Sequence, residues 1–151
     1  MPVYAINKKG RFNYTFLENL EVGIVLSGAE VKSIKQNRVN FQGAYVSYEN
    51  SELWLKQTHI SPYQEKNQPG YNPDRIRKLI LKRKEIDRLM GKIKSEGLTI
   101  IPEKVYSKGG LIKVQICLAR GKKQYDKRAV IKKRESQRNI KRALKGMSHN
   151  R

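Results

Sequence analysis

The chain has little of what disulfide-linked, metal-binding or membrane proteins need. It holds a single cysteine, Cys117, so no disulfide can form within it. One cysteine and two distant histidines, His59 and His149, do not make a set of metal ligands. No apolar run approaches the roughly 20 residues of a membrane helix, and the start MPVYAINKKG lacks the apolar stretch of a signal peptide. We therefore expect a cytoplasmic protein with no membrane partner and without bound metal or cofactor.

Acidic residues are also scarce. The chain has 13 Asp and Glu against 33 Lys and Arg, which gives a net charge of +20. Such a field attracts polyanions, above all nucleic acid. A metal-dependent nuclease would need several carboxylates, and the sequence contains no phosphate-binding loop and no nucleophile elbow. The sequence thus predicts a protein that is not an enzyme and takes no small-molecule substrate, with a nuclease as the most distant alternative.

The positive charge is concentrated toward the C-terminal end. Residues 1–119 carry a net charge of +9, whereas residues 120–151 alone carry +11. We expect residues 1–119 to form a folded body and residues 120–151 a tail that is too self-repulsive to collapse in water. An apolar stripe at helical spacing runs through the tail, formed by Ile140, Ala143, Leu144 and Met147. The tail is therefore predicted to be disordered when free and helical when bound to an anion.

Short apolar segments separated by turns predict a mainly β body with helices. Strands are expected at 11–19, 21–28, 38–49, 52–60, 98–107 and 111–119, with hairpin turns at Asn50-Ser51 and Lys108-Gly109-Gly110. Pro102 predicts an edge position or a bulge within its strand. A short helix is expected over 29–36, and a long one from Asp74, as N-cap, to Gly97. Six antiparallel strands with one short and one long helix fit a small closed or nearly closed barrel.

Aromatic residues are spread through this basic body, among them Tyr45, Tyr63 and Trp54. Aromatic rings stack on unpaired bases while lysine and arginine neutralise phosphates, although strand aromatics such as Phe12 and Phe16 are equally suited to a core. Composition therefore indicates nucleic-acid binding without separating RNA from DNA. A ribosomal or rRNA-assembly protein with a basic tail is the main alternative at this level.

Six motifs then occur in order: NKK (7–9), EVGIVLSGAEVKSI (21–34), HISPY (59–63), RIRKLIL (75–81), EGLTIIP (96–102) and GKKQYDKR (121–128). Together they resemble the SsrA-binding protein family, also called small protein B, over residues 5–145. The resemblance implies an oligonucleotide-binding-type (OB-type) β-barrel. It also implies an adaptor that binds the tRNA-like domain of transfer-messenger RNA (tmRNA). Such an adaptor delivers tmRNA to stalled ribosomes for trans-translation and peptide tagging.

The resemblance further implies which residues of the body bind tmRNA. They are Asn7, Glu21 and Ile80, with Lys8 and Lys9 as basic neighbours of Asn7. Asn7 and the lysines are ordinary RNA contacts. Glu21 could accept hydrogen bonds from base amino groups or a 2′-hydroxyl, or it could orient a neighbouring Lys or Arg. Ile80 is expected to shape the surface by packing.

For the tail, the resemblance implies insertion into the empty decoding centre and mRNA channel of the small ribosomal subunit, whose walls are rRNA phosphate. The matching residues are Gly121, Lys122, Lys123, Tyr125, Asp126, Lys127 and Arg128. Tyr125 would stack on a decoding-centre base, and Lys127 and Arg128 would donate hydrogen bonds to phosphates. From the residues alone, a generic polyanion-binding tail explains the same charges equally well.

Overall fold

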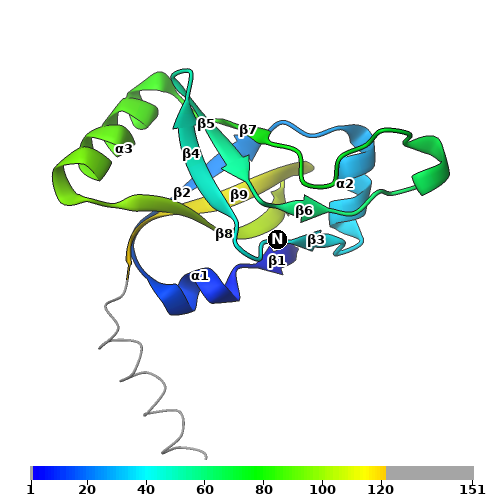
Figure 1. Ribbon diagram of the computed structural model, residues 1–151, viewed down its shortest axis with the longest axis horizontal. Helices are drawn as coiled ribbons and strands as arrows, with labels where there is room; N and C mark the ends of the chain where they lie inside the picture. Colours follow the sequence, from blue (N-terminus) through cyan, green and yellow to red (C-terminus); the bar gives the residue numbers. More distant parts are fainter. Residues whose placement is uncertain (1, 122–151) are drawn as a thin grey trace, which may run out of the picture. The chain divides into compact units, whose positions relative to one another are not determined.

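The computed structural model describes residues 2–121, which contain nine strands, three α-helices and one 3-10 turn (Figure 1). The strands are β1 (Val3–Ile6), β2 (Tyr14–Ile24), β3 (Val39–Asn40), β4 (Tyr45–Glu49), β5 (Glu52–Lys56), β6 (His59–Ile60), β7 (Arg77–Ile80), β8 (Thr99–Lys108) and β9 (Leu111–Gly121). The helices are α1 (Lys8–Asn13), α2 (Gly28–Lys35) and α3 (Arg83–Glu96), and the 3-10 turn is η1 (Glu65–Asn67). The first compact unit of the chain spans Met1–Arg120. The tail sites expected from Lys122 to Arg128 lie outside the described residues.

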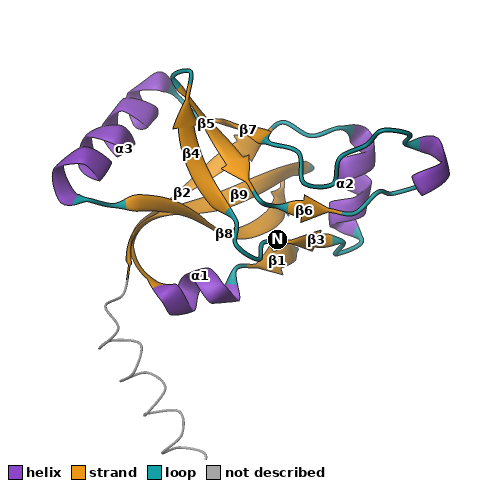
Figure 2. Ribbon diagram, in the orientation of Figure 1, coloured by secondary structure: helices purple, strands orange, loops and turns teal. Residues whose placement is uncertain are grey.

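Seven of these strands form one antiparallel sheet in the order β1-β8-β9-β2-β7-β5-β4, and β3 pairs with β6 in a small second sheet (Figure 2). The expected mainly β architecture is confirmed, but the described strands number nine rather than six. The large sheet is open, because β1 and β4 are its edges and do not pair with each other. Closure into a barrel is therefore not confirmed. Contacts between β4 and β8 nevertheless roll the sheet around its core.

Both expected hairpins are confirmed. Asn50 and Ser51 join β4 to β5 with φ of 54° and 62°, and Gly109 and Gly110 join β8 to β9 with φ of 59° and 78°. Positive φ at both central residues belongs to the type I′ turn, whose twist matches that of the flanking strands. The bulge expected at Pro102 is also present, because the register of β8 on β9 shifts between Pro102 and Lys104.

The long helix begins later than expected. The spacing of apolar residues predicts a start at Asp74, but α3 starts at Arg83 and residues 77–80 form strand β7. Asp74 does not cap a helix, since its Oδ1 lies 3.0 Å from Nδ1 of His59. Gly97 ends α3 as expected, with φ of 64° in the left-handed region that favours glycine.

The N-terminal part also differs from the expectation. Alternating aromatic residues predict a strand over 11–19, but α1 occupies Lys8–Asn13 and an additional strand, β1, precedes it. Strand β2 then runs without a break from Tyr14 to Ile24, which joins two segments expected as separate strands. The short helix expected over 29–36 is confirmed as α2.

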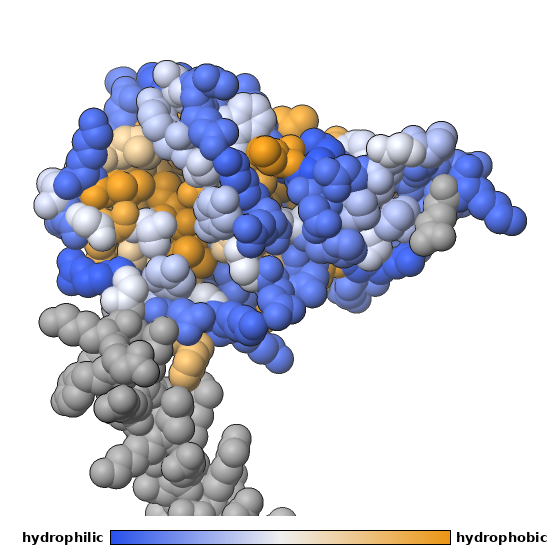
Figure 3. All heavy atoms as spheres, in the orientation of Figure 1, coloured by the Kyte–Doolittle hydropathy of each residue, from blue (hydrophilic) through white to orange (hydrophobic). Residues whose placement is uncertain are grey.

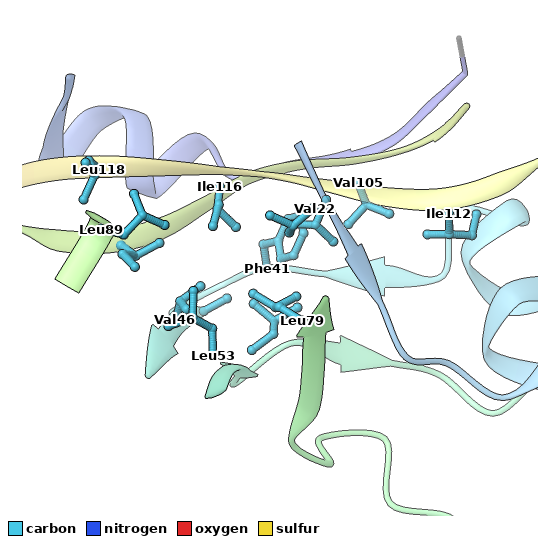
Figure 4. Packing of buried hydrophobic residues seen from close by; sticks show 14 of the residues in the cluster. Val22, Phe41, Val46, Leu53, Leu79, Leu89, Val105, Ile112, Ile116 and Leu118 are labelled. Atoms are coloured by element: carbon cyan, nitrogen blue, oxygen red, sulfur yellow. The ribbon is translucent and has the colours of Figure 1, made fainter. Parts of the chain in front are cut away.

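The core lies inside the curve of the large sheet and beneath α3. Figure 4 shows Phe41 surrounded by side chains from several strands, among them Val22, Leu79 and Val105. Leu53, Leu55 and Leu79 are fully buried, and each such side chain contributes roughly 1.5–3 kcal/mol by leaving water. Cys117 is buried, where a free cysteine packs as a small apolar side chain.

A hydrophobic patch beside α3 is visible in Figure 3, where the core is incompletely covered. The elements α3, β4 and β8 border a hollow of about 140 Å³ there, lined by Val46, Tyr48, Met90, Ile93 and Leu98, among other residues.

Candidate RNA-binding surface

Glu21 lies on the outer face of the large sheet. Side chains alternate between the faces of a strand, so the buried Val22 directs its neighbours Glu21 and Gly23 outward. Ile80 of β7 pairs with Gly23 of β2, and a Cβ placed on Gly23 would lie 3.2 Å from the Ile80 Cβ. Ile80 is 56% exposed. The structure therefore brings Glu21 and Ile80 together on one face, with Ile80 packed over Gly23 and open to solvent.

The Glu21 carboxylate is held by two groups from β8. Nζ of Lys108 lies 3.2 Å from Oε2 of Glu21. Burial raises the pKa of the Tyr106 hydroxyl, and the nearby Glu21 carboxylate raises it further, to about 12. Tyr106 thus keeps its proton at neutral pH and presents a hydrogen-bond donor to Glu21. Of the two roles expected for Glu21, orientation of a neighbouring basic residue matches this geometry.

Two further lysines lie around Tyr106. Nζ of Lys104 lies 5.5 Å from the centroid of the Tyr106 ring, within range of a cation–π interaction. Lys113 of β9 lies directly opposite Tyr106 in the β8–β9 ladder, so the two side chains share a face. Lys108 therefore contacts Glu21 directly, while Lys104 and Lys113 lie beside Tyr106. The nearby carboxylate of Glu103 is paired with Arg11, so this part of the sheet carries net positive charge.

Asn7 has a different environment from that expected of a direct RNA contact. It is 4% exposed and is the N-cap of α1. Its Oδ1 accepts a hydrogen bond from the Gly10 amide at 2.9 Å, and its Nδ2 donates to the Pro102 carbonyl at 2.8 Å. Asn7 therefore fixes α1 onto β8, and the exposed residues that follow it are Lys8 and Lys9.

Gly10 permits this close contact between α1 and its cap. A Cβ at Gly10 would lie 2.6 Å from Nδ2 of Asn7, which is closer than real Cβ contacts.

Two hollows flank α1. One of about 400 Å³ is lined in part by Lys9, Asn13, Tyr14 and Tyr45. The other, of about 230 Å³, is lined in part by Lys8, Asn40 and Gln42.

Glu30 and Arg77, both fully buried, form the most enclosed ion pair of the described residues. Glu30 closes a capping box with Ser27, because each backbone amide donates to the other's side chain. All five N–H donors of Arg77 have acceptors: Glu30 Oε2, the carbonyls of Thr58, Arg75 and Pro73, and the Tyr71 hydroxyl. This network holds α2 and the 61–75 segment on β7, so Glu30 has a structural role.

The sequence did not single out Tyr106, Lys104, Lys108 or Lys113. One signal was available in the sequence, because residues 104–108 read Lys, Val, Tyr, Ser and Lys just before the expected hairpin turn. That alternation places Lys104, Tyr106 and Lys108 on one face of the strand. Their proximity to Glu21 depends on the order of the strands, which the sequence alone does not reveal.

Within residues 2–121 no group of three or more His, Cys, Asp or Glu side chains is placed to hold a metal ion. In the same part of the chain, no helix has the length and apolar character needed to cross a bilayer.

An outer sheet face with clustered lysines, next to an exposed isoleucine and a basic helix, suits a phosphate backbone with unpaired bases. Fold and surface together define a small, basic, mainly β protein of the nucleic-acid-binding class. The chain belongs to the SmpB family, whose model, described as SmpB protein, matches residues 4–146.

Curated relatives extend over nearly the whole chain. An SsrA-binding protein of Streptococcus mutans is 48% identical over 143 residues, which cover 95% of this chain and 92% of the relative. An SsrA-binding protein of Desulfitobacterium hafniense is 47% identical and covers 94% of this chain and 91% of the relative. A chain in the solved structure "tmRNA-SmpB: a journey to the center of the bacterial ribosome" superimposes with a TM-score of 0.67 at 42% identity. That match covers 82% of this chain and 87% of the solved chain.

Proposed function

We propose that this protein is an RNA-binding adaptor of trans-translation. It binds the tRNA-like domain of tmRNA and delivers tmRNA to stalled ribosomes in the cytoplasm, and it is not an enzyme. The observation that carries the proposal is family membership over residues 4–146, supported by SsrA-binding relatives at 48% and 47% identity. The solved neighbour, from a structure named for tmRNA-SmpB and the ribosome, supports the same partners.

The body carries the tmRNA-binding surface in this proposal. Glu21 and Ile80 contribute from the outer sheet face, and Lys8 and Lys9 contribute from α1. Asn7 acts by capping α1, because its polar atoms are already bonded to Gly10 and Pro102. The rolled sheet belongs to the OB type, with the contacts between β4 and β8 in place of a hydrogen-bonded closure.

The tail, residues 120–151, senses the ribosome in this proposal. Beyond the end of β9 it is disordered in the free protein and becomes helical in the decoding centre and mRNA channel, where rRNA phosphates remove its self-repulsion. Gly121, Lys122, Lys123, Tyr125, Asp126, Lys127 and Arg128 make the decoding-centre contacts. An mRNA in the channel would exclude the tail, so binding reports that the message is missing.

Affinity capture followed by RNA sequencing tests this function. The full chain, tagged and expressed in a bacterium that lacks its own SmpB-family protein, should recover tmRNA selectively over bulk tRNA and rRNA. Recovery of rRNA in stoichiometric subunits without tmRNA enrichment would instead identify a ribosomal or rRNA-assembly protein. Incubating the recovered RNA with the protein and Mg²⁺ should leave it intact, and cleavage would identify a nuclease.

A further inference from the structure

We propose that Lys104, Lys108 and Lys113 form the phosphate-binding part of the tmRNA surface, and that Glu21 acts by positioning Lys108 rather than by touching RNA. This inference rests on the proposed function and assigns chemistry to residues that the family motifs do not mark. The ligand is a run of RNA phosphates that crosses the β8–β9 hairpin toward Ile80.

The first step concerns the freedom of Lys108. Its side chain is 56% exposed at the end of β8, next to the Gly109-Gly110 turn. A free lysine there loses rotamer entropy when it binds a phosphate. The contact with Glu21, at 3.2 Å, restricts the ammonium group before RNA arrives. Lysine has three N–H donors, so two remain for phosphate oxygens.

The second step concerns the charge of Glu21. A lone carboxylate on an RNA-binding face repels phosphates, so an unpaired acid would weaken binding. Glu21 is instead surrounded by the ammonium group of Lys108 and by the Tyr106 hydroxyl, and its side chain is only 33% exposed. Lys104 and Lys113 then leave a local excess of positive charge. The carboxylate is thus oriented toward protein donors and serves to arrange cations.

The third step concerns the neighbouring apolar surface. Ile80 of β7 lies over Gly23 of β2, the strand that carries Glu21. More than half of the Ile80 side chain faces solvent. An exposed isoleucine beside clustered lysines offers an apolar contact for a ribose or base whose phosphates lie on β8 and β9. The lysines and Ile80 therefore form one continuous surface over β8, β9, β2 and β7.

Matched lysine variants of the full chain test the phosphate assignment. Lys108→Ala should weaken binding to a transcribed tRNA-like domain of tmRNA by roughly tenfold, as expected for one lost charge-assisted hydrogen bond. The slope of log K against log[salt] should fall in magnitude by about 0.7–0.9, the value for one phosphate contact. Lys94→Ala is the control, because Lys94 is an exposed lysine on α3, away from the proposed surface. Helix α3 contacts Glu18, whose side chain lies on the face of β2 opposite to that of Glu21. Equal affinities and slopes for the two variants would overturn the assignment.

A double-mutant cycle tests the positioning role. Glu21→Ala should weaken binding several-fold in the parent protein but have almost no further effect in the Lys108→Ala background. Full additivity would show that Glu21 contacts RNA independently, which would overturn its positioning role. Melting temperatures should be nearly unchanged for all three variants, since both side chains lie at the surface. A parent protein that does not prefer the tRNA-like domain over an unrelated tRNA refutes the proposed function. A selective parent with equal Lys108→Ala and Lys94→Ala variants refutes only this inference.

Discussion

Nε of Arg77 donates a hydrogen bond of 2.7 Å to Oε2 of Glu30, and neither side chain has any exposed surface. The two residues are 47 positions apart, on β7 and α2. Removing two charges from water is costly, and the pair is tolerated because hydrogen bonds satisfy its remaining polar atoms. The pair also explains why a charged residue occupies an inward position of a central strand.

Breaking this pair from one side should destabilise the body strongly. Arg77→Met leaves the Glu30 carboxylate buried with fewer partners, and the expected loss is about 3–5 kcal/mol in the free energy of unfolding. Urea denaturation followed by tryptophan fluorescence measures it, because Trp54 is the only tryptophan. The double variant Arg77→Met with Glu30→Leu removes both charges and should regain much of the loss. A single variant as stable as the parent would show that the network is not structural.

The same pair predicts how stability depends on acid. Burial alone raises the pKa of Glu30, but hydrogen bonds from Arg75, the Ser27 amide and Arg77 outweigh it and lower the pKa from 4.5 to about 2. Because the folded state holds the carboxylate ionised, this stabilisation is complete above pH 4.5 and is lost as the pH falls toward 2. It amounts to about 3 kcal/mol. Urea titrations from pH 6 to pH 2 should show that the free energy of unfolding falls more steeply with decreasing pH in the parent than in Glu30→Gln. Parallel plots of this free energy against pH would contradict the assignment.

The hairpins, the short helix and the end of the long helix could be predicted from the sequence because each has a local cause. Positive φ at Asn50-Ser51 and Gly109-Gly110 suits a two-residue turn, and Gly97 suits a helix C-terminus. Residues 77–80 could not be assigned in this way. Ile76, Leu79 and Ile80 fit a helical period, and the alternation that marks β7 is hidden because one of its two inward residues is Arg77. The distant Glu30, together with the carbonyls of Thr58 and Pro73, makes that arginine acceptable in the core.

Helix α1 and the lysine cluster depend on similarly distant contacts. A helix of six residues is too short to be stable alone, and α1 forms because Asn7 binds both Gly10 and the carbonyl of Pro102. The partners Glu21 and Lys108 are 87 positions apart and meet only because β8, β9 and β2 are neighbours in the sheet. Family motifs indicated Glu21 and Ile80, but they gave no sign of the partner of Glu21.

The cap of α1 supplies another test. Asn7→Ala should destabilise the protein by about 1–2 kcal/mol, since it removes an N-cap and leaves the Pro102 carbonyl without its donor. It should also weaken tmRNA binding, because Lys8 and Lys9 lose their fixed position. Lys8→Ala, by contrast, should weaken binding while leaving the melting temperature nearly unchanged. Calorimetry and a filter-binding titration separate the two effects, and an Asn7→Ala protein of parental stability would show that the cap is dispensable.

The central claim, that the body binds tmRNA while the tail licenses rescue, is tested most directly by peptide tagging. The measurement is tmRNA-dependent tagging in a reconstituted translation system on a message that lacks a stop codon. The parent chain should support tagging. Changing Asp126, Lys127 and Arg128 together to Ala lowers the net charge by only one, so bulk attraction to RNA barely changes.

This triple variant should bind tmRNA and reach ribosomes as the parent does, yet fail to support tagging, because directed contacts in the decoding centre are lost. The near-neutral control, Lys132→Ala with Glu135→Ala, should tag far better. Equal tagging by the parent, the triple variant and the control would contradict the account and leave the tail as a generic polyanion binder.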